Sequence, residues 1–322
     1  MKALVQHGYG PPKSLKVADI DTPAPGPGEV LVQVAAAGLG ADVWHLTTGL
    51  PYPVRLVAGL RRPHQTIAGL DLAGHVTAIG EGVHDLAVGD RVFGTGLGAL
   101  AETARARADK LALLPGNVGF EAAAATPISG VTALQALRDK AEVQAGQRVA
   151  VLGAGGAVGS FAVQIAKILG AEVTGVCGPA KADLVADLGA DHVIDYTRSD
   201  FDTGAPFDAI IDTAGHRPLR VLHRALTPRG TAVIVGSETG GRWLGGVDRQ
   251  LRAALLSPFT TRRLGSLIAA EDRAELETLA GYLAEGRLHP VTTPAENLEA
   301  APEALQRWTK GTTVGRTVVT VQ

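Results

Sequence analysis

Residues 149–170 limit the fold more than any other stretch of the chain, because they are mostly apolar and carry five glycines. Over eighteen consecutive positions from Val149, the only polar side chains are Ser160 and Gln164. A helix that spans a membrane needs about 20 apolar residues of good helical propensity, and glycine lowers that propensity. The glycines therefore argue against a membrane span.

A strand, a glycine turn, a helix and a second strand fit the same region better. The apolar runs 148–152 and 172–176 are of strand type. Between them, apolar residues recur with helical spacing at Ala162, Ile165, Ala166 and Leu169. Gly170 is placed to end that helix. The sequence predicts a βαβ unit whose glycine turn would hold a nucleotide pyrophosphate at the helix N-terminus.

Composition indicates a globular chain long enough for two domains. The 322 residues are 46% hydrophobic and 19% charged, which excludes a disordered or fibrous protein. A net charge of −2 gives no basic footprint for nucleic acid. Cys177 is the only cysteine, so the chain can form neither an intrachain disulfide nor a cysteine-rich metal site. The first residues lack an apolar signal core, and we expect a cytoplasmic protein without nucleic-acid or membrane partners.

The two halves of the chain differ in pattern. Up to about residue 120, short strands separated by turns predict a β-rich, barrel-like domain, as where Val30, Val32 and Val34 alternate after a Pro-Gly-Pro-Gly turn. From Glu121 on, helices alternate with strands, which predicts an α/β fold with a doubly wound parallel sheet. The further helices are expected over 128–146, 218–226 and 270–286, and the further strands over 191–196, 207–215, 230–238 and 315–322. Because no helix follows the last strand, we expect it to return to the N-terminal domain.

Several segments, taken in order, carry a resemblance to a known family. They are PGPGEVLVQVAAAGL at 25–39, GLDLAGHVTAIGEGV at 69–83, VGDRVFG at 88–94, PISGVTALQAL at 127–137, the glycine turn, LGADHVIDY at 188–196 and TPRGTAVIVG at 227–236. The chain resembles the medium-chain dehydrogenase/reductase superfamily in its zinc-free, quinone-oxidoreductase-like branch, to which zeta-crystallin is similar. The resemblance implies a GroES-like catalytic domain at 1–122, completed by 268–322, and a Rossmann NADP-binding domain at 123–267. It also implies a homodimer that acts on a small-molecule carbonyl or quinone.

The resemblance also implies where a nicotinamide cofactor binds. An NAD-type site has an acidic residue at the end of the second strand, where this chain has Cys177 and Gly178. Lys181 can pair with a 2′-phosphate, which favours NADPH, although a solvated lysine is an equally good interpretation. The residues that the resemblance assigns to the cofactor are Thr132, Ala154, Gly156, Ala157, Val158, Gly159, Cys177, Gly178, Lys181, Tyr196, Ala214, Val235 and Gly236.

Zinc ligands of the related alcohol dehydrogenases have no counterparts in this sequence. Gly40 and Leu70 stand at the positions of the first cysteine and the histidine, and the stretch around Ser129 has no thiol. A zinc site needs three or four ligands held together, so we expect no metal. Without zinc to stabilise an alkoxide, alcohol oxidation becomes costly, whereas reduction of a quinone or enone needs only donors for one oxygen.

Tyr52 and His45 are the candidate catalytic residues, either as hydrogen-bond donors to the substrate oxygen or, for His45, as a proton donor. Both could instead only line the pocket. The sequence predicts an NADPH-dependent reductase of a quinone or an α,β-unsaturated carbonyl. Two alternatives stay open: a metal-free alcohol or carbonyl dehydrogenase, and a crystallin-like NADPH-binding protein of low turnover.

Overall fold

The computed structural model of the chain describes residues 1–236, 241, 243–246, 249–250, 252–253 and 261–321. The fold contains two compact units, Met1–Val131 with Glu271–Gln322, and Thr132–Ala270. These are called unit 1 and unit 2 below. The domain limits expected at 122 and 267 stay predictions.

Strands dominate unit 1. Its seven-stranded sheet has the order β14-β15-β3-β4-β5-β7, with β6 paired to β3, and β1 pairs with β2 in a separate ladder. The bounds are β1 Lys2–Val5, β2 Lys16–Asp19, β3 Glu29–Leu39, β4 Asp71–Ile79, β5 Arg91–Thr95, β6 Thr103–Arg107, β7 Leu111–Leu113, β14 Thr292–Ala295 and β15 Arg316–Thr320. Within β3, Val30, Val32 and Val34 are fully buried while Gln33 is exposed, so the predicted strand is confirmed.

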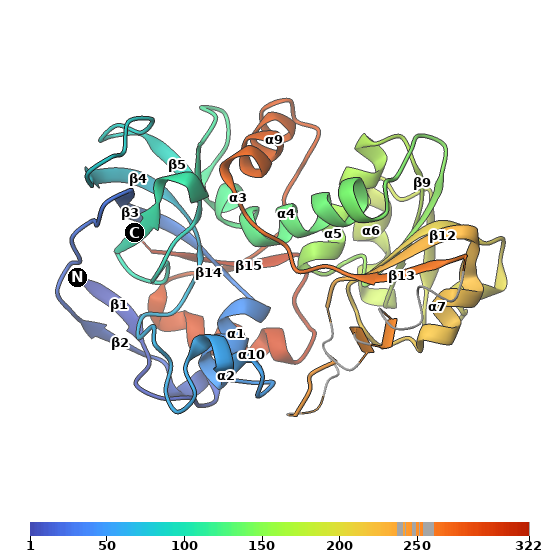
Figure 1. The fold of residues 1–322 in the computed structure, drawn as a ribbon, viewed down its shortest axis with the longest axis horizontal. Helices are drawn as coiled ribbons and strands as arrows, with labels where there is room; N and C mark the ends of the chain where they lie inside the picture. The colour runs from blue at the N-terminus through green and yellow to red at the C-terminus, as the bar shows by residue number, and fades with distance from the viewer. Residues whose placement is uncertain (237–240, 242, 247–248, 251, 254–260, 322) are drawn as a thin grey trace. The chain divides into compact units, whose positions relative to one another are not determined.

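The last strand returns to the N-terminal residues, as predicted. β15 pairs antiparallel with β3, with Val318 opposite Gly38 and Val319 opposite Ala37. Figure 1 shows β15 in red among strands of the blue and green part of the chain. The C-terminal residues thereby complete the sheet of unit 1.

Helices in unit 1 connect and cover these strands. They are η1 Pro12–Ser14, α1 Ala41–Thr48, α2 Val54–Ala58, η2 Ala108–Lys110, α3 Phe120–Ala124, α9 Arg273–Ala284, η7 Leu298–Ala300 and α10 Ala301–Thr309. The first 120 residues form the expected β-rich domain, but they also contain two helices that the sequence pattern did not indicate, α1 and α2 at 41–58. α9 begins after Asp272, whose carboxylate caps the helix by accepting the Glu275 amide at 3.0 Å.

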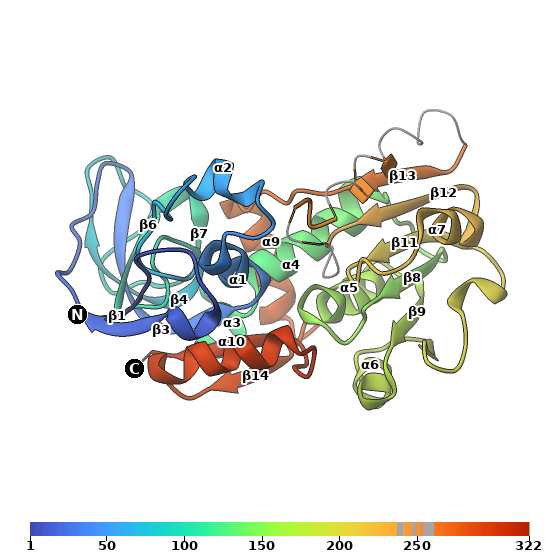
Figure 2. The same cartoon turned by 90° about the horizontal axis from the view of Figure 1, so that it is seen from below.

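Unit 2 contains a six-stranded sheet of the order β10-β9-β8-β11-β12-β13, in which every pairing is parallel. Figure 2 shows these strands one after another from β13 to β9. The bounds are β8 Arg148–Leu152, β9 Glu172–Cys177, β10 His192–Asp195, β11 Phe207–Asp212, β12 Leu226–Ile234 and β13 Arg263–Ser266. The predicted doubly wound α/β fold is confirmed. β13 was not expected, and Leu226 belongs to a strand rather than to the predicted helix.

Helices of the second unit precede or follow its strands. They include η3 Ala136–Lys140, α5 Ala157–Ile168, η4 Pro179–Lys181, α6 Ala182–Asp187, η5 Phe201–Thr203 and α7 Leu219–Ala225. α4, Pro127–Gln135, begins in unit 1 and ends in unit 2. The helix predicted over 128–146 stops at Lys140, because Glu142 adopts a left-handed backbone conformation with φ of 52°. Residues 237 and 238 of the predicted strand 230–238 lie outside the described residues.

Candidate functional site

The glycine turn between β8 and α5 is shaped for close approach of a ligand. Gly153 has a φ of 82°, which favours glycine, and α5 begins after Gly156. A Cβ at Gly159 would lie 2.1 Å from the Gly153 carbonyl oxygen, so only glycine fits there. The first amides of a helix have no intrahelical partner. Those of Ala157 and Val158 are therefore available to an anion at this N-terminus.

Ends of the neighbouring strands lie against this turn. The Thr213 hydroxyl donates to the Leu152 carbonyl at 2.8 Å. Ala214 lies close to Gly153, since a Cβ added at Gly153 would be 3.3 Å from the Ala214 Cβ. Gly236 lies close to Thr213, since a Cβ added at Gly236 would be 3.0 Å from the Thr213 carbonyl oxygen. The structure thus gathers three predicted cofactor residues at the carboxyl edge of the sheet: Ala214, Val235 and Gly236.

The end of β9 brings together the residues predicted to bind a 2′-phosphate. The side chain of Lys181 packs on the glycine turn. It lies so close that a Cβ added at Gly155 would be only 2.7 Å from the Lys181 Cδ. The Tyr196 hydroxyl lies 3.3 Å from the place of a Cβ on Gly178, so a larger residue at 178 would crowd it. Cys177, beside them, is buried. These contacts join two strand ends to the turn, as a dinucleotide site requires.

A carboxylate that the sequence did not indicate lies at the same place. Asp195 ends β10 in register with Cys177. The pKa of the Cys177 thiol is raised first by the burial of the thiol and next by the negative charge of Asp195. Asp195 accepts the Thr197 amide at 2.9 Å and the Thr197 hydroxyl at 2.7 Å, and the backbone bond above all holds its pKa below the usual range. Arg198 lies 3.6 Å from its other oxygen. Thr197 and Arg198 thus compensate the charge of this carboxylate.

His45 lies on α1 with its orientation fixed. Its Nδ1 lies 2.6 Å from the Leu50 carbonyl oxygen, and the Trp44 ring packs edge-on at 5.0 Å between centroids. Because a carbonyl only accepts, Nδ1 carries the hydrogen and Nε2 is the second, reactive position of the ring. The helix ends at Gly49, whose φ is 61°. Of the two ring nitrogens of His45, Nδ1 is therefore engaged by the backbone.

The guanidinium of Arg55 lies over the rings of two tyrosines, Tyr52 and Tyr9, and the sequence did not indicate Tyr9 as part of this site. The Arg55 guanidinium lies 5.0 Å from the Tyr52 ring centroid and 4.5 Å from that of Tyr9. Its Nε donates to the Gly49 carbonyl at 3.0 Å, and the Tyr9 hydroxyl donates to the Gly59 carbonyl at 2.5 Å. Tyr52 remains 36% exposed. Arg55 therefore holds the ring of Tyr52 at the surface of unit 1.

A buried charge cluster occupies the place where a zinc ligand was considered. Nη2 of Arg316 donates to Asp42 at 2.8 Å and to Asp71 at 2.7 Å, and the Ile128 amide donates to Asp71 at 3.2 Å. Burial raises the pKa of Asp71 to about 8 although Arg316 acts in the opposite direction. A Cβ at Gly40 would lie 2.5 Å from Nη1 of Arg316. The guanidinium thus fills the space that a ligand side chain at position 40 would need.

Thr132, predicted to approach the nicotinamide, lies on α4 with 8% of its surface exposed. Within the part of the chain that the structure describes, no three histidine, cysteine, aspartate or glutamate residues are grouped to hold a metal ion. No described helix is both long and apolar enough to cross a bilayer.

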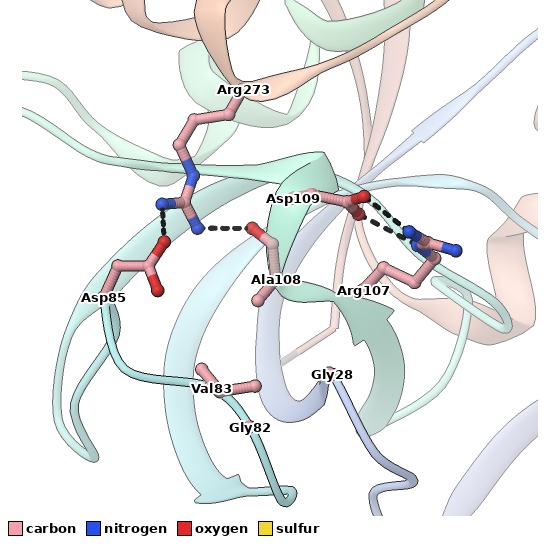
Figure 3. Close-up of a pocket in the computed structure, with 8 residues that line it drawn as sticks. All are labelled: Gly28, Gly82, Val83, Asp85, Arg107, Ala108, Asp109 and Arg273. Carbon is pink, nitrogen blue, oxygen red and sulfur yellow. Dashed lines mark hydrogen bonds and ion pairs between the residues drawn. The ribbon is translucent and has the colours of Figure 1, made fainter.

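A surface hollow of about 370 Å³ in unit 1 contains none of the predicted site residues. Figure 3 shows that its charged groups pair with their neighbours, Arg273 with Asp85 and Arg107 with Asp109. Arg273 also donates to the Ala108 carbonyl at 2.7 Å. With these donors and acceptors already paired, the hollow offers little to a polar ligand.

Comparison with known proteins agrees with this architecture. Residues 26–125 match the alcohol dehydrogenase GroES-like domain, and residues 188–319 match the family described as zinc-binding dehydrogenase. Quinone oxidoreductase of Pseudomonas aeruginosa is 32% identical over 323 residues, which cover 95% of this chain and 96% of that one. The chloroplast envelope quinone oxidoreductase homolog of Arabidopsis thaliana is 29% identical over 334 residues, covering 99% and 98%.

Among solved structures, Escherichia coli quinone oxidoreductase complexed with NADPH matches with a TM-score of 0.84 and 25% identity, over 99% of this chain and 100% of that chain. A parallel Rossmann sheet and a GroES-like domain on one chain define a two-domain oxidoreductase. The chain belongs to the medium-chain dehydrogenase/reductase superfamily, in its quinone-oxidoreductase-like branch.

Proposed function

We propose that the protein is an NADPH-dependent reductase that transfers a hydride to a quinone or to the carbon–carbon double bond of an α,β-unsaturated carbonyl, without zinc. The observation that carries this proposal is the contact at position 40. A Cβ on Gly40 would lie 2.5 Å from the Arg316 guanidinium, so the first ligand position has no room for a thiolate. A second position is Leu70, which has no ligand atom.

The residues of unit 2 fit a dinucleotide phosphate. Gly153, Gly156 and Gly159 form the turn at the start of α5, where the helix dipole favours a pyrophosphate. Tyr196 lies beside Gly178 and the side chain of Lys181 lies beside Gly155, and these two residues would hold a 2′-phosphate. The Escherichia coli quinone oxidoreductase structure is a complex with NADPH, which supports the same cofactor.

When bound, NADPH supplies the hydride. The protein then has to bind the substrate, exclude water and hold the charge that develops on the carbonyl oxygen. The Tyr52 hydroxyl is the proposed donor to that oxygen, with Arg55 holding its ring. Nε2 of His45 can pass a proton to the oxygen or the α-carbon when the ring carries two protons, because Nδ1 is held by Leu50.

The variant Tyr52→Phe tests this assignment. It keeps the ring against Arg55 and removes only the hydroxyl, so turnover of an enone or quinone should fall by about 10- to 100-fold, the lower part of the range for oxyanion donors. The NADPH dissociation constant, measured by fluorescence titration, should not change. Full activity of the variant would contradict the role of Tyr52 and leave His45 as the next donor to test.

A second variant distinguishes the role of the Tyr52 hydroxyl from the role of Arg55, which holds the Tyr52 ring. Arg55→Gln removes the cation that lies over Tyr52 and Tyr9, and it should raise the KM for the substrate while leaving the hydroxyl in place. If both variants behaved alike in kcat and KM, Tyr52 would act only as a pocket wall.

A further inference from the structure

The carboxyl edge of the sheet in unit 2 has a switch point next to the glycine turn. β8 pairs with β9 on one side and with β11 on the other. From β8 the strand order runs through β9 to β10 in one direction and through β11 to β12 in the other, so the order reverses at β8. In open parallel sheets, ligands bind outside the carboxyl ends of the strands at such a point. Leu152, at the end of β8, is in register with Asp212, at the end of β11. Asp212 is therefore placed directly at the switch point.

Asp212 is fully buried and holds an arginine. Its Oδ1 accepts the Gly215 amide at 3.0 Å, and its Oδ2 lies 2.5 Å from Nη2 of Arg249. The same Nη2 donates to the Arg217 carbonyl at 2.7 Å. A buried carboxylate that fixes one end of a guanidinium also fixes the direction of its other N–H groups.

The rest of that guanidinium is buried without partners. Nε and Nη1 of Arg249 have no hydrogen-bond partner among the described residues, and the whole side chain is only 13% exposed. Arginine carries five N–H donors, and leaving buried donors unpaired costs free energy. Compensation of the charge by Asp212 does not satisfy these N–H groups. Their position at the switch point indicates a ligand oxygen as the acceptor.

We propose that Arg249 binds the pyrophosphate of the cofactor from the side opposite the N-terminus of α5, with Asp212 as its positioning residue. This inference rests on the proposed function, because it needs a dinucleotide at the glycine turn. A pyrophosphate is favoured over the nicotinamide carboxamide because a planar guanidinium matches phosphate oxygens with two donors at once. The Thr213 hydroxyl, next in the chain to Asp212, also donates to the carbonyl that precedes Gly153.

The test compares three ligands that share parts of NADPH. NADPH contains every part, 2′-phospho-ADP-ribose keeps the pyrophosphate but lacks nicotinamide, and 2′,5′-ADP has the 2′-phosphate without the pyrophosphate. Because Arg249→Gln alone leaves Asp212 buried and unpaired, the double variant Arg249→Gln with Asp212→Asn is used as well. The control is Arg224→Gln with Asp202→Asn, another Arg–Asp pair of the same unit.

Dissociation constants from titration calorimetry, with circular dichroism as a check on folding, decide the outcome. The Arg249 variants should bind NADPH and 2′-phospho-ADP-ribose about tenfold or more weakly and 2′,5′-ADP as the native chain does. Unchanged affinities would overturn the proposal, and so would a loss for NADPH alone or an equal loss for all three ligands. If the native chain itself bound none of them, the proposed function would be wrong instead.

Discussion

At the scale of single residues, the choice of cofactor depends on Lys181. Its stem lies on Gly155 and it faces no acid at position 177 or 178, while the nearby Asp195 is compensated by Thr197 and Arg198. We expect NADPH to bind at least tenfold more tightly than NADH, about 1.4 kcal/mol, and Lys181→Ala to remove most of that difference. Fluorescence titration with both cofactors measures it, with Lys140→Ala as the control. Equal affinities of the native chain would disprove the expectation.

Gly159 gives a second test at the residue scale. An alanine Cβ would lie 2.1 Å from the Gly153 carbonyl oxygen, and backbone cannot give way there as a flexible side chain can. Gly159→Ala should lower the free energy of unfolding by about 1–3 kcal/mol and weaken NADPH binding more than tenfold. Gly204→Ala, where no atom lies within 4 Å of the added Cβ, should change neither. Thermal denaturation and cofactor titration check both variants.

At the scale of elements, the Asp71–Arg316–Asp42 cluster connects β4, β15 and α1 and also binds the start of α4. The pKa of Asp71 is higher in the folded chain, about 8, than its usual value of 3.8. The folded state therefore binds more protons between these values, and the free energy of unfolding falls as pH rises through that window. The nearby Glu271, whose pKa is also raised by burial, contributes in the same direction.

Asp71→Asn should remove part of this pH dependence, because asparagine binds no proton. Urea denaturation at a series of pH values from 4 to 8 measures the slope. Asp85→Asn is the control, because the hydrogen bond and charge of Arg273 lower the pKa of Asp85 and its effect lies at more acid pH. A slope that is the same in the native chain and in Asp71→Asn would show that this carboxyl does not titrate in the window.

Some of these elements could be predicted from the sequence and others could not. β8 was predicted residue for residue, because its apolar run ends at a glycine turn, and β9 extends only one residue further, to Cys177. α1 and α2 were missed, since eight and five residues give too little periodicity to separate a helix from a strand. The buried pairs of Asp71 and Asp212 were missed too, although an acid at the end of an apolar strand was the available signal. Their partners, Arg316 and Arg249, are distant in sequence, and only the fold brings them close.

At the scale of the whole molecule, the proposed reaction runs without a metal. Elemental analysis of the purified protein should find less than stoichiometric zinc, because Gly40 has no room for a ligand and Leu70 has no ligand atom. Prolonged dialysis against a chelator should leave the activity unchanged. One zinc per chain, with loss of activity on chelation, would contradict the expectation and call for a ligand set outside these positions.

The most direct measurement of the central claim is the loss of NADPH absorbance with a panel of quinones, enones and enals, set against the reduction of NADP by secondary alcohols. We expect the protein to reduce some quinones, enones or enals and to use NADH poorly in place of NADPH. Alcohols should be poor substrates, because no predicted pocket group stabilises an alkoxide as zinc does. Alcohols oxidised faster than enones or quinones are reduced would contradict the claim, as would tight NADPH binding with no turnover of any substrate in the panel.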